Sequence, residues 1–432
     1  MPTFFEFFAG GGMVRAGLGD AWDCKFTNDF DKRKCETYRK NWGGPEILCE
    51  DVNLVRNHPL PHTPHLVWAS FPCQDLSLAG GGAGLKGDRS GTFWPFWEVI
   101  KALKNMGPLP NIIVLENVCG TLTSHDGKDF AAIIDAFATM RMRVGAMVID
   151  AELFVPQSRP RLFFIAVSGN DVPAGLCADE AQDLWHPSPL KRAYMRLTPE
   201  QKRAWIWWKL PTPPRRTRRF ADLVEANPTD VAWHTREETR RLMAMMAPAH
   251  RKRVEQARVA KRPVIGAIYK RTRIDGDGQK VQRAEVRFDE VAGCLRTPAG
   301  GSSRQTIIIV AGKDVRSRLI SSRETARLMG LPDTYILPAR YNEAYHLTGD
   351  GVVVPVVGHL SANILLPIIN GRQEVAGELH SVQERRRGGD DSEVHSVQFE
   401  VRQNGRDVER KTRVSQGGVE QRVSKWTPIR RS

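Results

Sequence analysis

The chain has 432 residues and a mass of 48.5 kDa, which is enough for two or three domains, each with its own core. Lys and Arg (63) outnumber Asp and Glu (49), and the net charge of +14 makes a polyanion the first partner to consider. The start lacks a basic leader, no apolar run approaches the roughly 18 residues of a membrane span, and the seven cysteines form no CxxC pair, so we expect a cytosolic protein without a metal site.

The first 170 residues alternate short apolar segments with helical stretches, a pattern that predicts a parallel sheet covered on both faces. One helix is marked by the spacing of four apolar residues, Phe130, Ile133, Ile134 and Phe137. The expected strands are residues 3–8, 25–28, 66–70, 111–115, 143–149 and 162–167. We therefore predict an α/β fold with a doubly wound, Rossmann-like sheet, whose ligands bind beyond the carboxyl ends of the strands.

The first three strand ends carry the pattern of a nucleoside pocket. A glycine turn at residues 8–12 follows the first strand, and Asp29 ends the second about 20 residues later, where ribose hydroxyls are usually held. Asp51 stands in the same position after the third segment. The turn alone is equally compatible with an ordinary strand-to-helix connection. Because GxGxxG is missing, an adenosyl group is favoured over a dinucleotide.

Cys73 follows the fourth strand in a loop braced by Pro72. A lone cysteine is usually a small buried hydrophobe, but the glycine-rich segment 79–91 that follows this one could act as a lid. Glu116, at the end of the next core strand, supplies a carboxyl group beside a nucleophile; it could equally be a capping or ion-paired carboxylate.

Arg159 and Arg161 precede the strand at 162–167. Alternate residues of an extended segment face one way, so both would point at an anion or a base edge, although two such arginines could also be solvated.

From about Asp171 to Gly300 the strand–helix pattern stops, and proline, tryptophan and arginine predict a second domain of irregular structure. Residues 191–290 hold 25 basic against 12 acidic residues, a surplus of 13 that predicts a dedicated basic face. The clustered Trp205, Trp207 and Trp208 are expected in a core rather than on a base-stacking surface. After residue 370 the chain is polar and charged and predicts a tail.

The segments EFFAGGG, NDFD, FPCQ, ENV and QSRPR, in this order, resemble the successive motifs of the DNA (cytosine-5) methyltransferase family. Residues 322–335 and 349–356 resemble its last two motifs. The resemblance implies S-adenosyl-L-methionine as cofactor, no metal, and a target-recognition domain inserted before the final motifs. It therefore divides the chain into a catalytic part at 1–175, a DNA-binding insert at 176–300, a returning catalytic part at 301–370 and a tail at 371–432.

The resemblance also assigns roles to residues. Cys73 would attack C6 of a flipped-out cytosine as a thiolate, Glu116 would hold N3 and the amino group, Arg161 would hold the base carbonyl and Arg159 would support the loop. The cofactor-binding residues would be Phe8, Ala9, Gly10, Gly12, Asp29, Phe30, Asp51, Val52, Pro72 and Asp350. The substrate-binding residues would be Gln74, Ser77, Arg89, Asn117, Val118, Gln157 and Thr297.

Three positions depart from the family pattern. Glu6 stands where the family usually has Asp, Met13 where it has the last glycine of the turn, and Asp350 where it has Asn. A carboxylate only accepts hydrogen bonds, whereas an amide also donates them, so cofactor affinity is the property in question at Asp350.

The expected function is sequence-specific methylation of duplex DNA in a restriction–modification system. The expected protein is a cytoplasmic, nucleoid-associated monomer of a prokaryote or phage, with a cognate restriction endonuclease as a further partner. The alternatives are an RNA cytosine-5 methyltransferase, a catalytically silent DNA-binding relative and, more remotely, a nicotinamide-dependent dehydrogenase.

Overall fold

The computed structural model describes residues 1–72, 92–169, 172–274, 276, 278–297 and 303–371, together with three strands between residues 397 and 421. The chain divides into two units, Met1–Gly371 and Arg372–Ser432. The strands of the second unit pair antiparallel in the order β14-β15-β16. They are β14 (Val397–Gln403), β15 (Asp407–Gln416) and β16 (Val419–Gln421).

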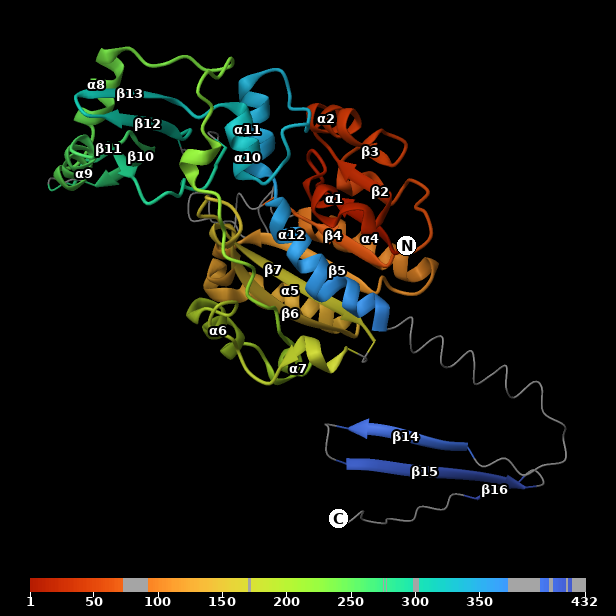
Figure 1. Ribbon diagram of the computed structural model, residues 1–432. Helices are drawn as coiled ribbons and strands as arrows, with labels where there is room; N and C mark the ends of the chain where they lie inside the picture. The colour runs from red at the N-terminus through yellow and green to blue at the C-terminus, as the bar shows by residue number, and fades with distance from the viewer. Residues whose placement is uncertain are drawn as a thin grey trace. The chain divides into compact units, whose positions relative to one another are not determined.

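A seven-stranded sheet in the order β3-β2-β1-β4-β5-β7-β6 forms the centre of the first unit (Figure 1). Its strands are β1 (Thr3–Phe7), β2 (Asp23–Asp29), β3 (Ile47–Cys49), β4 (Leu66–Ala69), β5 (Ile112–Val118), β6 (Met142–Asp150) and β7 (Pro160–Ser168). This confirms the α/β fold and the six expected strands. The sheet is not purely parallel, because β7 runs antiparallel to both of its neighbours, β5 and β6. The connection from β6 to β7 is too short for a parallel crossover.

Helices cover both faces of this sheet, as a doubly wound fold requires. Alternate strand residues serve the two faces: Phe4 packs with α1 (Met13–Leu18) and α12 (Val354–Leu360), whereas Phe5 packs with α4 (Phe93–Met106) and α5 (Lys128–Thr139). Figure 1 shows α12 lying across one face of the sheet. The four residues that predicted the α5 face, Phe130, Ile133, Ile134 and Phe137, are fully buried, which confirms that helix.

The remaining helices connect the strands and build the region after β7. They are α2 (Lys32–Trp42), α3 (Val52–Val55), α6 (Ser188–Met195), α7 (Pro199–Arg203), α8 (Arg236–Ala244), α9 (Pro248–Arg258), α10 (Ser322–Leu328) and α11 (Tyr341–Asp350). The expectation of irregular structure between residues 171 and 300 was therefore wrong. Four proline residues there stand beside or in the first turn of a helix, where proline is favoured, instead of breaking it: Pro187, Pro189, Pro199 and Pro248.

The tryptophan cluster packs against the seven-stranded sheet. The backbone of Trp205 forms a parallel β-bridge with Val144 of β6, and Trp208 donates its indole N–H to the Ile165 carbonyl at 3.1 Å. Trp205 and Trp208 are buried, which confirms the prediction that the cluster serves a core. Two short strands, β8 (Cys177–Ala178) and β9 (Trp207–Trp208), pair beside it.

A second, four-stranded antiparallel sheet follows in the order β11-β10-β12-β13. Its strands are β10 (Val264–Ile274), β11 (Lys280–Arg287), β12 (Thr306–Ala311) and β13 (Asp314–Leu319). α8 and α9 cover one face through a small core that includes Leu242, Val254, Ile268, Val286 and Ile308. The predicted boundary at residue 300 falls inside this sheet, because β12 and β13 complete it.

The apolar stretch near residue 360 is longer than the sequence analysis expected. The helical run Tyr341–Gly371 is long and apolar enough to cross a membrane by length and composition alone, so the expectation that no run approaches this length was wrong. More than half of its most apolar window, 56%, is buried within the protein. α12 packs on α1 there, as a core helix does.

Candidate active site

The carboxyl ends of neighbouring parallel strands bring the predicted motifs together at one edge of the seven-stranded sheet. β2, β1, β4 and β5 lie side by side and run parallel. Along this edge the order is Asp29 at the end of β2, the glycine turn 8–12 after β1, Pro72 after β4 and Glu116 near the end of β5. Four predicted site residues, Cys73, Gln74, Ser77 and Arg89, lie outside the described residues.

The glycine turn combines a packed position with an open one. Gly10 and Gly12 have φ angles of 58° and 78°, which residues with side chains rarely adopt. A Cβ atom on Gly12 would lie 2.4 Å from Nε1 of Trp42, whereas one on Gly10 would meet nothing within 4 Å. Gly12 is therefore required by packing, and Gly10 leaves the backbone open to a ligand. Phe8 and the buried Ala9 complete the turn.

Asp29 ties the turn to the end of β2. Its Oδ2 accepts the Gly10 amide at 2.8 Å, and its Oδ1 accepts the Asp31 amide at 2.9 Å. Burial raises the pKa of this carboxyl group, while Lys34 acts to lower it. Each carboxylate oxygen retains a further lone pair for a ligand hydroxyl. The next residue, Phe30, leaves 66% of its surface exposed.

Asp51 caps a helix at the same edge. Its Oδ1 accepts the Asn53 backbone amide at 2.8 Å and the Asn53 side-chain amide at 2.7 Å, so the carboxylate stabilises the first turn of α3. Val52 is buried beneath it. Asp51 itself is exposed, and its second oxygen accepts none of the hydrogen bonds found among the described residues.

Met13 and Asp350, two of the departures from the family pattern, take part in neighbouring contacts: Met13 lies beside Gly351, and Asp350 pairs with Lys34. A Cβ atom on Gly351 would lie 2.3 Å from the sulfur of Met13, so the Met13 side chain fills the space beside this glycine. Asp350 pairs with Lys34, with 2.9 Å between Oδ2 and Nζ. Burial alone would lower the pKa of Lys34, but Asp350 and then Asp29 raise it. Lys34 therefore supplies a positive charge to the acidic cluster.

Glu6, the third departure, lies beneath the turn. Burial raises the pKa of its carboxyl group to about 8, because the Val14 and Arg15 amides that favour the charged form oppose burial only in part. Glu6 is therefore mostly neutral at pH 7 and adds little charge to this edge of the sheet.

Glu116 and Arg161 form a buried pair at the end of β5. The Arg161 Nε atom lies 3.2 Å from Oε1 of Glu116, and only 6% of Glu116 is exposed. Burial raises the pKa of Glu116, while Arg161 and Arg159 lower it to a smaller extent. The carboxyl group is thus protonated at higher pH than an ordinary glutamate, as a proton donor to a base requires.

Asn117 fixes the backbone in front of Pro72. Its side-chain amide donates to the Phe71 carbonyl at 3.2 Å, and its Oδ1 accepts the Val118 amide at 2.8 Å. The ends of β4 and β5 are therefore tied together within two residues of Cys73. Asn117 is buried, and Val118 is partly exposed.

Arg159 and Gln157 support the walls of the site. Arg159 is 2% exposed and donates to the carbonyls of Leu295, Gly349 and Gly351 at 2.7–2.9 Å. It therefore holds protein backbone through three hydrogen bonds, and the group that it shares with Arg161 is the sulfur of Cys294. Gln157, predicted to contact substrate, is fully buried and accepts the Leu295 amide at 3.0 Å. In this structure its side chain supports the same segment.

Cys294 is a site residue that sequence reasoning missed. Its sulfur lies 3.5 Å from Nη1 of Arg159 and 3.8 Å from Nη2 of Arg161. Although burial opposes ionisation, Arg159, Arg161 and Arg296 lower the pKa of this thiol to about 7. No local pattern marks this position, because both arginines come from more than 130 residues away. Thr297, three residues on, lies against Gly349.

We expect Cys294 to make stability depend on pH in a defined direction. Its folded pKa lies below the unfolded value of about 8.5, so its stabilisation is present above the unfolded pKa and lost as the pH falls through about 7. Urea unfolding of the native chain and of Cys294→Ser should show a free-energy difference that grows between pH 7 and pH 9. Cys177→Ala is the control. Because burial raises the pKa of Cys177, the difference in unfolding free energy between the native chain and Cys177→Ala should shrink as the pH rises. A pH-independent Cys294 difference would contradict the prediction.

A basic hollow of about 190 Å³ lies between the loop before β7 and the four-stranded sheet. Cys294 and Pro160, the residue before Arg161, are part of its lining. Four cationic residues contribute to it: Lys270, Arg271, Arg287 and Arg296. The concentration of positive charge beside the catalytic edge suits a nucleic-acid backbone.

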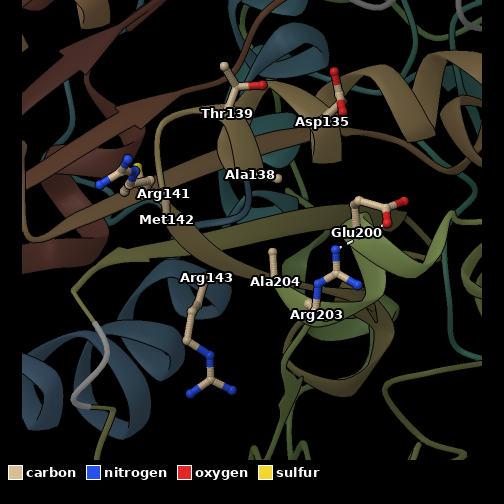
Figure 2. A pocket seen from close by; sticks show the side chains of 9 residues that line it. All are labelled: Asp135, Ala138, Thr139, Arg141, Met142, Arg143, Glu200, Arg203 and Ala204. Atoms are coloured by element: carbon tan, nitrogen blue, oxygen red, sulfur yellow. Dashed lines mark hydrogen bonds and ion pairs between the residues drawn. The ribbon is translucent and has the colours of Figure 1, made fainter.

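A larger hollow, about 420 Å³, lies elsewhere on the first unit (Figure 2). It is formed by the end of α5, the start of β6 and α7, with Glu200 and Arg203 paired at 3.1 Å. β6 runs parallel to β5, so its first residues lie at the amino edge of the sheet. This hollow is therefore remote from the predicted motifs.

Three comparisons with known proteins agree with this arrangement. The family model described as C-5 cytosine-specific DNA methylase matches residues 2–365. Type II methyltransferase M.NlaX of Neisseria lactamica is 26% identical over 83% of this chain and 94% of its own, and M.BsuFI of Bacillus subtilis is 26% identical over 82% and 70%. The solved structure of the Entamoeba histolytica methyltransferase EhMeth has the same fold, with a TM-score of 0.52, 12% identity and coverage of 86% and 98%.

Proposed function

Because this chain belongs to the C-5 cytosine-specific DNA methylase family, we propose that it methylates C5 of a flipped-out cytosine in duplex DNA through a covalent adduct with Cys73, using S-adenosyl-L-methionine. The protein is a DNA cytosine-5 methyltransferase of the restriction–modification type. The donor, the adduct and the site residues are the proposed part. The observation that carries the proposal is the buried Glu116–Arg161 pair beside the segment that leads into Cys73.

The residues of the carboxyl edge fit an adenosyl cofactor. Gly10 leaves space above the backbone, and Asp29 retains acceptor capacity for ribose hydroxyls. Phe30 offers an exposed aromatic face next to them. Lys34 and Asp350 together match the two opposite charges of an amino-acid group. When bound, the cofactor would supply a sulfonium methyl group open to nucleophilic attack.

The chain's own residues would make the cytosine ring nucleophilic. The Cys73 thiolate would add to C6 while protonated Glu116 donates a proton to N3, which leaves an electron-rich C5. Arg161 would hold the base carbonyl and keep Glu116 in place. After C5 gains the methyl group, a base removes the C5 proton, and the electrons of that bond expel the Cys73 thiolate.

The basic hollow and the insert would hold the duplex. Extrusion of the base costs a few kcal/mol, which contacts to the surrounding backbone must offset. Arg296 and Arg287 line the hollow next to Cys294, and Arg287 lies opposite Ala267, on the face of the four-stranded sheet that packs toward the seven-stranded sheet. Phosphate contacts at this place would fix the register of the DNA relative to Arg161.

The decisive experiment is expression in a methylation-free host followed by bisulfite sequencing. We expect the native chain to protect cytosines in one short motif, and Cys73→Ala to protect none. Cys177→Ala, at a partly buried cysteine of the short strand β8, should methylate as the native chain does. Complete conversion of all cytosines with the native chain would overturn the proposed function.

We expect Lys34 and Asp350 to act as one unit in cofactor binding. Lys34→Ala leaves Asp350 unpaired beside Asp29, and this excess of negative charge should weaken S-adenosylhomocysteine binding by about fivefold, or about 1 kcal/mol. Asp350→Asn in the same chain should restore part of the affinity, because it removes the unbalanced charge but also the carboxylate that would face the ammonium group of the ligand. Isothermal titration calorimetry measures both. Equal affinities of the native chain and Lys34→Ala would contradict the prediction.

We also propose that the protein is a cytoplasmic, nucleoid-associated monomer and that a cognate restriction endonuclease recognises the same DNA site. The names of the curated relatives, which are Type II methyltransferases, support the part of this proposal that concerns a restriction endonuclease.

A further inference from the structure

The free end of the β10–β11 ribbon presents arginines on one face. The two strands pair antiparallel, with Arg271 opposite Arg283 and Tyr269 opposite Glu285. Strand alternation places these residues and Arg273 on the same face. The other face carries Ile268, Ala284 and Val286, which α8 and α9 cover. From Arg271 to Ile274 the strand is exposed.

This arginine face is on the side of the four-stranded sheet that packs toward the seven-stranded sheet and lines the basic hollow. Ala267 and Ile307 lie on the same face of the sheet and belong to the core that the catalytic sheet shares with α12. Further along the ribbon, Tyr269 and Arg271 line the basic hollow together with Cys294. Since Cys294 contacts Arg161, one continuous surface leads from the catalytic pair to the ribbon. In Figure 1 the ribbon belongs to the sheet that α8 and α9 cover from the other side.

Glu285 fixes the arginines of this face in place. Its Oε1 accepts Nε of Arg273 at 2.7 Å and Nη2 at 2.5 Å, and its Oε2 lies 3.7 Å from Nε of Arg271. The Arg271 guanidinium stacks 4.5 Å from the centroid of the Tyr269 ring. Glu285 is only 9% exposed, whereas half of the Arg273 side chain is exposed. A buried carboxylate thus orients exposed guanidinium groups.

Among the described residues, the contacts of Arg273 leave a defined set of its N–H donors without a partner. An arginine has five N–H groups, and Glu285 engages two of those of Arg273. Both N–H groups of Nη1 and one of Nη2 remain, and these form the planar fork that matches the O6 and N7 acceptors of guanine. Arg271 and Arg273 share one carboxylate on this face, so the ribbon keeps a positive charge that suits a groove of DNA.

We propose that the β10–β11 ribbon enters the major groove and that Arg273, held by Glu285, reads a guanine of the recognition sequence. The width of the major groove admits a two-stranded ribbon of this kind. The inference rests on the proposed function, because it assigns the base-reading element of the DNA that the enzyme methylates. Arg271, stacked on Tyr269 nearer the hollow, contacts the neighbouring position. The recognition sequence therefore contains at least one guanine at a fixed distance from the target cytosine.

The test compares the methylated motif of the native chain with those of Arg273→Ala and Arg273→Lys, by bisulfite sequencing over a library with randomised sites. We expect both variants to accept other bases at one position where the native chain requires guanine. Methylation of the native motif should fall about 5- to 150-fold, the range that one bidentate base contact supplies. Arg273→Lys retains the charge. If this variant also accepts other bases, the planar guanidinium group and not the charge is responsible for the recognition of guanine.

Arg241→Ala is the matched control. Arg241 is an exposed arginine that pairs with Glu237 on α8, and α8 packs on the face of the sheet opposite to Arg273. It should leave the motif unchanged. Glu285→Gln should relax the same position as Arg273→Ala, but to a smaller extent. A uniform loss of methylation with every base preference intact would overturn the proposal and assign Arg273 to the phosphate backbone. Absence of methylation by the native chain would overturn the proposed function itself.

Discussion

Glu116→Gln lowers the rate of methyl transfer by about 10²- to 10⁴-fold, the range that one general acid–base group contributes, while cofactor affinity is unchanged. The amide has nearly the shape of the carboxyl group but carries no acidic proton for N3 of the base. Glu116 lies at the end of β5 beside Arg161, away from the Lys34–Asp350 pair that we assign to the cofactor. The measurement is single-turnover methylation at saturating DNA and cofactor, with S-adenosylhomocysteine binding measured separately.

The pH dependence of the native enzyme follows from the same carboxyl group. Burial raises the pKa of Glu116, so the protonated form persists above the range of an ordinary glutamate. Activity that requires this form should fall as the pH rises through the raised pKa. Stability should change in the same direction: a raised folded pKa means that stabilisation is present below the unfolded pKa and lost as the pH rises. Glu116→Gln should therefore become more stable than the native chain at high pH.

An exposed glutamate separates these effects from a general loss of charge. Glu98 lies on α4, pairs with Lys101 and is about half exposed. Glu98→Gln should leave the rate, the pH profile and the stability close to native. If Glu116→Gln retained the native rate, or if its cofactor affinity fell together with its rate, the assignment of Glu116 to the base would be wrong.

The strand-end residues were predictable because they obey a local rule. Asp29 and Glu116 each stand at the end of a buried apolar segment, and the parallel order of the sheet brings such positions to one edge. The tryptophans near residue 205 were also assigned correctly to a core, since large aromatic side chains are costly to leave exposed.

The contacts that complete the site could not be predicted in this way, because they join distant segments. Lys34 and Asp350 are separated by 316 positions, and neither has a local pattern that indicates its partner. Arg159 was predicted to support a loop, but the backbone carbonyls that it holds, those of residues 295, 349 and 351, lie more than 130 positions away. Proline and arginine content suggested irregular structure after residue 171, although the hydrophobic positions of β10 and α9 build a separate core there. Whether such a region forms regular structure depends on pairing between strands that are distant in the sequence, as for β10 and β12.

A second large effect concerns the junction between the insert and the returning catalytic part. Arg318 and Glu324 are 0% and 1% exposed and form a double contact, with Nη2–Oε1 at 2.6 Å and Nη1–Oε2 at 2.8 Å. Glu324 also accepts the amides of Glu225 and Ser321, both at 2.7 Å. Arg318 donates to the Glu225 carbonyl at 2.9 Å. The pair therefore joins β13, the start of α10 and the segment before α8.

We expect Glu324→Ala to lower the free energy of unfolding by about 3–5 kcal/mol, because it leaves the Arg318 charge buried without a partner. Urea unfolding followed by circular dichroism measures the loss. Glu200→Ala removes an exposed partner of Arg203 and should cost less than about 1 kcal/mol, which makes it the control. A loss at Glu324 as small as that at Glu200 would show that water reaches Arg318 once the carboxylate is gone.

Replacing both partners separates the charge from the hydrogen bonds. In Arg318→Met with Glu324→Leu no charge remains buried, and in other proteins apolar replacement of a buried pair has been neutral or stabilising. Here the Glu225 and Ser321 amides and the Glu225 carbonyl also lose their partners, and each unsatisfied group costs about 1–3 kcal/mol. The double variant should therefore recover only part of the stability lost in Glu324→Ala. Full recovery would mean that the pair contributes little beyond balancing its own charge, whereas no recovery would mean that its main role is to hold the backbone at this junction.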